Sequence, residues 1–167
     1  MKRALAAMLL LAACSKGDVI PGPRATPATG LEAAAIEAGV IPDPASVDIT
    51  GLYAHDTDRV CIVPSAKAYR IGVLVDYGDN VTCASSGTVT RSGETLDVDI
   101  PAAPGCSFEA RFEGDRLVFP AQVPEACARL CQRRASLAAL KVERLSESAS
   151  EASTLRDGKG QLLCDGS

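Results

Sequence analysis

The side chains best suited to chemistry are seven cysteines, which form two groups. Cys14 ends an apolar run, while the other six are spread along the rest of the chain: Cys61, Cys83, Cys106, Cys127, Cys131 and Cys164. A thiol can act as a nucleophile, a metal ligand or half of a disulfide, depending on its surroundings. An even number of cysteines in a small exported chain predicts a disulfide framework, whose pairing the sequence leaves open.

The segment before Cys14 has the pattern of an export signal. Lys2 and Arg3 give it a positive start, and residues 4–13 are an unbroken apolar run. As a helix the run spans about 15 Å, half of a hydrocarbon core, so it is too short to cross a bilayer but long enough for a signal. Residues 1–14 resemble the signal peptide and lipobox of a bacterial lipoprotein.

The resemblance implies that residues 1–13 are removed and that Cys14 becomes the lipid-carrying N-terminus. Stable anchoring takes more than one acyl chain, which a multiply acylated cysteine supplies. Ser15, rather than Asp, after that cysteine resembles an outer-membrane address in Gram-negative bacteria. We therefore expect an outer-membrane lipoprotein of the cell envelope that faces the periplasm. The alternative is an ordinary cleaved signal, with Cys14 inside a secreted chain.

Cys127 and Cys131 are the only closely spaced cysteines. Structural zinc sites and thiol–disulfide enzymes both favour Cys-x-x-Cys, whereas three residues separate this pair. Disulfides are therefore favoured over a metal or redox centre. Helical geometry would hold the two side chains apart, so the prediction is two separate partners, one of them Cys164.

His55 is the one histidine, and Asp56 and Asp58 lie beside it. A small metal or acid–base site could use these three residues, but a hydrolytic metal needs further ligands that no recognisable spacing supplies. Aspartates are also common in tight turns. We expect a polar hairpin turn here, with no metal and no cofactor, and keep a small envelope enzyme as an alternative.

Composition limits the classes of partner. Lys and Arg number 17 and Asp and Glu 21, for a net charge of −4, and loss of Lys2 and Arg3 leaves −6. Such a chain has no general attraction to nucleic acid. It is also mildly repelled by anionic lipid, so lipid rather than charge must hold it on a membrane.

Sequence patterns divide the chain into four parts. After the signal at 1–13, residues 14–48 form a lipid-anchored tether with a short helix at 30–38, expected to dock through Leu31, Ala35 and Ile36. A β-rich core domain follows at 49–120, and a C-terminal helix with a disulfide-tied tail at 121–167. We expect strands near the following ranges: 50–54, 59–64, 69–77, 81–90, 94–100, 106–112 and 115–119.

The predicted fold class is α+β. Residues 95–100 and 107–113 alternate between apolar and polar, and tight-turn residues separate the runs, which favours antiparallel neighbours. Six to seven strands then make a meander curled or closed into a small barrel. Residues 125–145 lack Gly and Pro and are rich in Ala, Leu, Arg and Glu, which predicts a helix packed on that barrel.

These observations favour a non-catalytic envelope lipoprotein that acts as a binding or structural module. Its partners would be the membrane, through the anchor, and an envelope protein or cell-wall ligand. Small β-barrel lipoproteins that inhibit lysozymes or envelope proteases share this general layout. A periplasmic inhibitor is therefore a second hypothesis, and the envelope enzyme based on His55 and Asp56/Asp58 a third.

Overall fold

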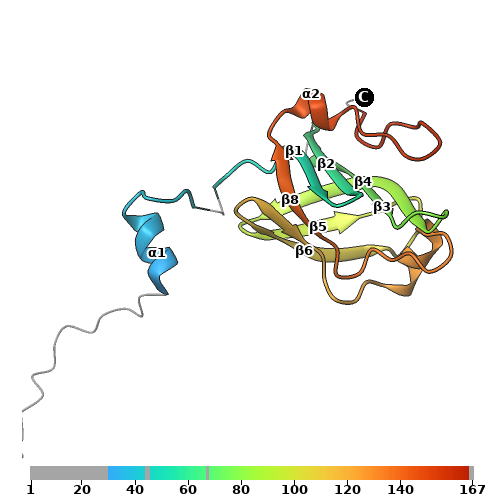
Figure 1. Ribbon diagram of the computed structural model, residues 1–167. Helices are drawn as coiled ribbons and strands as arrows, with labels where there is room; N and C mark the ends of the chain where they lie inside the picture. The colour runs from blue at the N-terminus through green and yellow to red at the C-terminus, as the bar shows by residue number, and fades with distance from the viewer. Residues whose placement is uncertain (1–29, 44–45, 67, 166–167) are drawn as a thin grey trace, which may run out of the picture.

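The computed structural model describes residues 30–43, 46–66 and 68–165 (Figure 1). Eight antiparallel strands, joined in sequence order, form a closed barrel. Their bounds are β1 Gly51–His55, β2 Asp58–Pro64, β3 Tyr69–Asp76, β4 Thr82–Ser92, β5 Thr95–Asp99, β6 Ser107–Glu113, β7 Arg116–Val118 and β8 Lys141–Ser146. Cys14 and the predicted signal lie outside the described residues. In the part of the chain that is described, no helix is long and apolar enough to span a membrane.

Alternating side chains create the barrel. In β5, Leu96 and Val98 are buried while Asp97 and Asp99 are exposed, because successive side chains of a strand point to opposite faces. The same inward face holds Tyr53 and Phe112, both completely buried. Side chains therefore fill the interior, as is usual for a barrel of eight strands.

The barrel confirms the predicted antiparallel meander, but the strand count and the C-terminal helix were wrong. Residues 125–145 hold only a short 3-10 helix, η1 Glu125–Leu130, followed by irregular chain and β8. Arg133 and Ala139 have positive φ angles of 58° and 57°, which a continuous right-handed helix does not allow. β8 pairs with both β1 and β7, and this pairing closes the barrel.

The six cysteines of the domain form three disulfides, Cys61–Cys164, Cys83–Cys131 and Cys106–Cys127. Cys127 and Cys131 thus take separate partners, as predicted, but neither partner is Cys164. The last two bridges tie η1 and the chain after it to the barrel, which is a further reason why no long helix forms there.

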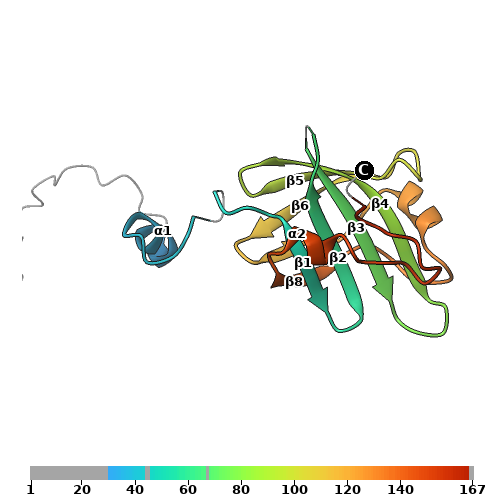
Figure 2. The same cartoon turned by 90° about the horizontal axis from the view of Figure 1, so that it is seen from above.

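The Cys61–Cys164 bridge holds the C-terminal tail against the outside of the barrel. Leu163, Cys164 and α2 (Ala149–Ala152) form a small second apolar cluster with β2. Gly72 makes this close approach possible, because a Cβ there would lie 2.5 Å from Leu163 Cβ. The tail is therefore part of the folded unit (Figure 2).

The short helix of the tether forms where expected, as α1 Gly30–Glu37. Its predicted docking through Leu31 is wrong, because that side chain is 92% exposed. Figures 1 and 2 both place α1 apart from the barrel. The physical reason is the alanine-rich sequence of the helix, which offers little apolar area to bury.

Candidate functional site

The two ends of the barrel are built differently. Residues 46–50 lead into β1 at one end, which we call the tether end, and the β4–β5 and β6–β7 turns lie there as well. The opposite end carries the β1–β2 turn, η1 and the bridges Cys83–Cys131 and Cys106–Cys127.

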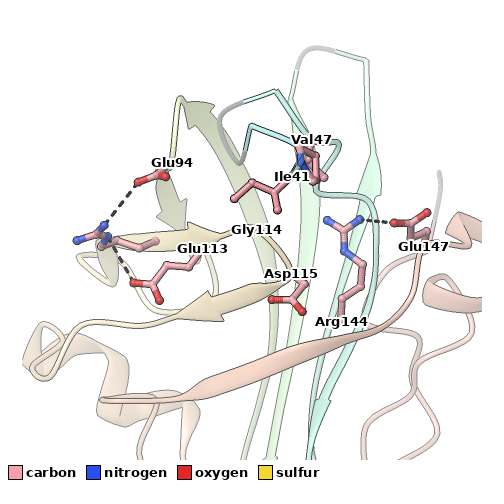
Figure 3. Close-up of a pocket in the computed structure, with 10 residues that line it drawn as sticks. Ile41, Val47, Glu94, Glu113, Gly114, Asp115, Arg144 and Glu147 are labelled. Atoms are coloured by element: carbon pink, nitrogen blue, oxygen red, sulfur yellow. Dashed lines mark hydrogen bonds and ion pairs between the residues drawn. The ribbon is translucent and has the colours of Figure 1, made fainter. Parts of the chain in front are cut away.

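A pocket of about 710 Å³ opens at the tether end (Figure 3). We call it the tether pocket, and its lining is Ile41, Pro42, Val47, Glu94, Arg111, Glu113, Gly114, Asp115, Arg144 and Glu147. Four carboxylates and two guanidinium groups make the lining net acidic. The tether supplies the one apolar wall.

Most charges in the pocket are paired. Arg111 lies 3.5 Å from the Glu94 carboxylate and 3.8 Å from that of Glu113. Arg144 Nη1 lies 3.0 Å from Glu147 Oε1. The described residues provide no ion-pair partner within 4.0 Å for Asp115, which lies between Glu113 and Arg144 in Figure 3. Asp115 is thus the carboxylate most open to an added cation.

Arg144 is the residue that connects the pocket to the core. Val142 and Arg144 share the inward face of β8, so the guanidinium lies where a further core side chain would be expected. Its Cζ is 5.5 Å from the ring centre of Tyr53 and 5.3 Å from that of Phe112, within cation–π range. Its Nη2 donates to the Asp48 carbonyl at 2.6 Å. Only 8% of the side chain is exposed, and Nε has no acceptor among the described residues.

Arg91 supports the same end of the barrel from β4. Its Cζ lies 5.2 Å from the Phe112 ring centre, and Nη1 donates to the Val47 carbonyl. Arg91 and Arg144 therefore hold two successive carbonyls, those of Val47 and Asp48. This attachment fixes the last residues of the tether against the barrel, so the apolar pocket wall is anchored next to the charged one.

Burial and charge set the electrostatics beneath the pocket. Burial raises the pKa of Tyr53 to about 12, although Arg144 acts in the opposite direction. The phenol donates to the Ile49 carbonyl at 2.7 Å. Burial also acts to raise the pKa of Asp48, but hydrogen bonds from the Thr50 N–H and hydroxyl, with Arg144 nearby, lower it below the usual value. Asp48 therefore remains ionised beside Arg144.

The predicted His55 site lies at the opposite end. His55 and Asp56 are exposed in the β1–β2 turn, with His55 Nε2 3.8 Å from Asp56 Oδ2. Asp58 accepts the backbone N–H of Asp76 at 3.1 Å, and burial raises its pKa. Asp58 thus fastens the turn to β3. Within the described ranges no three potential metal ligands come together.

The tether pocket is not predicted by the sequence patterns. Asp115 begins a predicted strand and Arg144 lies in the predicted helix at 125–145, so nothing brought the two residues together. The detectable signal was the spacing of Leu140, Val142 and Arg144, which is the period of a strand. Interpreting this spacing as a strand requires that an arginine side chain point into the barrel.

Comparison with known proteins gives no relative to guide the interpretation. No family model, curated protein sequence or solved structure matches the chain.

Proposed function

We propose that the protein is a lipid-anchored, non-catalytic binding module of the bacterial envelope, attached through Cys14, with the tether pocket as its recognition site. One observation carries the proposal. A closed barrel, cross-linked by three disulfides, presents a mixed-charge pocket at the end where the tether joins it.

Rigidity supports a binding role. Barrel closure and cross-links hold the pocket side chains in place before a partner arrives, which reduces the entropy cost of association. The interior is filled by side chains such as Tyr53 and Phe112, so a ligand must bind on the outer surface or at an end. The disulfides also suit an oxidising compartment such as the periplasm.

The location of the pocket supports a role for the tether beyond attachment. Ile41, Pro42 and Val47 belong to the tether and form a wall of the pocket. A partner bound there contacts both the tether and the barrel. Anchoring raises the local concentration of such a module near a membrane-associated partner.

Fatty-acid labelling tests the anchored part of the proposal. We expect the full-length chain, expressed in a Gram-negative host, to incorporate an alkyne-bearing fatty acid and to fractionate with the outer membrane. The Cys14→Ser variant should lose the label, because the hydroxyl is not the acceptor of the lipid in this pathway.

Ser15→Ala is the matched control, since it alters the neighbouring residue and leaves the thiol; it should retain the label. Equal labelling of Cys14→Ser and the unaltered chain would refute the anchor. A non-reducing gel of both variants separates loss of lipid from loss of the disulfide-linked fold.

A further inference from the structure

We infer that the tether pocket receives a lysine or arginine side chain carried on a loop of a cationic partner protein. This inference rests on the proposed binding function and names the chemistry of its ligand. The pocket has a charged wall and an apolar wall, and each matches one part of such a side chain.

The charged wall matches the cationic head group. The lining holds four carboxylates and two guanidinium groups, so an added cation brings the pocket closer to neutrality. Glu94 and Glu113 already share Arg111, and Glu147 pairs with Arg144. Asp115, which has no such pair among the described residues, is the acceptor that we assign to the incoming cation.

The apolar wall matches the methylene stem. Ile41, 37% exposed, lies with Pro42 and Val47 on the tether side of the pocket, across from Asp115 in Figure 3. Lys and Arg bury their methylene stems along apolar surface while the charged end remains in a polar environment. A small inorganic cation gains nothing from contact with this apolar wall, whereas the methylene stem of a long basic side chain can pack against it.

Arg144 keeps the charged wall in place. Its side chain is more than nine-tenths buried, lines the pocket and pairs with Glu147, while its Nη2 donates to the Asp48 carbonyl. Glu147 is therefore already engaged, and Asp115 is the carboxylate of the described lining that is available to an added cation.

Charge also favours a protein over an anionic cell-wall polymer as the partner that binds the tether pocket. The chain has a net charge of −4, and the pocket itself is net acidic. An anionic polymer is repelled by both, whereas a basic protein is steered toward them.

NMR titration of the ¹⁵N-labelled protein, purified in mild detergent after full-length expression, tests the inference. The probes are the N-acetyl methylamides of arginine and lysine, with those of norleucine and glutamate as neutral and anionic comparisons. We expect saturable shifts at the amides of Val47, Gly114 and Asp115 with the cationic probes only, at an affinity on the order of millimolar.

Asp115→Asn should weaken that affinity by about fivefold, because it removes the charge and keeps the shape. The matched control is Asp97→Asn, which removes the same charge from the exposed face of β5 and should stay within about twofold of the unaltered protein. Equal weakening by the two variants, equal binding of norleucine, or no saturation would overturn the inference.

A soluble cell-wall stem peptide with a free amino group is the last probe. Tighter binding of this peptide than of the lysine derivative would overturn assignment to a protein loop. Fatty-acid labelling at Cys14 does not depend on any of these results, so failure here is distinguishable from failure of the proposed function.

Discussion

Arg144 shows how one residue can serve both stability and recognition. Its guanidinium covers the rings of Tyr53 and Phe112 and bonds the Asp48 carbonyl. Cation–π contacts are worth about 0.5–2 kcal/mol and a charged hydrogen bond about 1.5–3 kcal/mol. These gains oppose a cost of about 1–3 kcal/mol for an unsatisfied buried Nε–H. The balance explains how the core tolerates a guanidinium that also lines the pocket.

The buried phenol of Tyr53, beneath Arg144, makes the stability of the fold depend on pH in the alkaline range. Its folded-state pKa of about 12 lies above the ordinary value of 10.0 because the ring is buried. An unfolded tyrosine ionises first, so the stability linked to this phenol is fully present below pH 10 and is lost as the pH rises to about 12. The loss amounts to about 2 kcal/mol.

Tyr53→Phe should remove this alkaline loss and cost about 1 kcal/mol at neutral pH, because the bond to the Ile49 carbonyl disappears. Phenolate absorbance during an alkaline titration, compared between the two proteins, should show one phenol that titrates near pH 12. A phenol at Tyr53 that titrates near its ordinary pKa would contradict the described burial.

At the scale of elements, β8 determines whether the barrel closes. It is only six residues long, yet it pairs with β1 on one side and β7 on the other. Val142 is its buried inward residue, and Glu143 is exposed beside Arg116 at 3.3 Å. Substitution by alanine should therefore change the free energy of unfolding much more at an inward position of this strand than at an outward one.

We predict that Val142→Ala lowers the free energy of unfolding by about 2 kcal/mol, since it removes buried methyl groups. Glu143→Ala should change it by no more than about 0.5 kcal/mol, because exposed ion pairs contribute little. Guanidinium unfolding under non-reducing conditions measures both. Alanine favours helix over valine, so an increase in stability from Val142→Ala would restore the helical interpretation of this segment.

The contrast between β8 and the earlier strands shows what sequence patterns can predict. Strands β1 to β7 follow from period-two alternation and turn residues, and their predicted ranges overlap the observed ones. The segment before β8 is rich in good helix formers, and an inward Arg144 breaks the apolar face. Local propensity therefore pointed to a helix, while pairing with two distant strands decided the outcome.

The tether pocket lay beyond sequence prediction for a related reason. Its lining comes from the tether, the end of β6, two turns and the end of β8 with the chain just after it, which only barrel closure brings together. Disulfide pairing likewise depends on contacts between distant parts of the chain, since Cys61 and Cys164 are separated by 103 positions in sequence. Periodicity identifies elements, but it does not specify which distant elements meet.

The whole molecule combines a tether with a barrel that three disulfides cross-link. The three disulfides join cysteines that are 103, 48 and 21 positions apart in the sequence. Bridges of this kind contribute about 2–4 kcal/mol each, which matters for a domain whose core has few large side chains. Disulfides persist in oxidising compartments, so the proposed export through the segment that ends at Cys14 would allow these three to form.

Intact-mass spectrometry of the protein, isolated without reduction from the cells that produce it, tests the proposed anchor and the disulfides together. We predict a chain that begins at Cys14, carries acyl groups on that residue and lacks the six thiol hydrogens that are lost when three disulfides form. An unacylated chain that still begins at Met1, with its thiols free, would contradict the anchor, the compartment and the cross-linked barrel together.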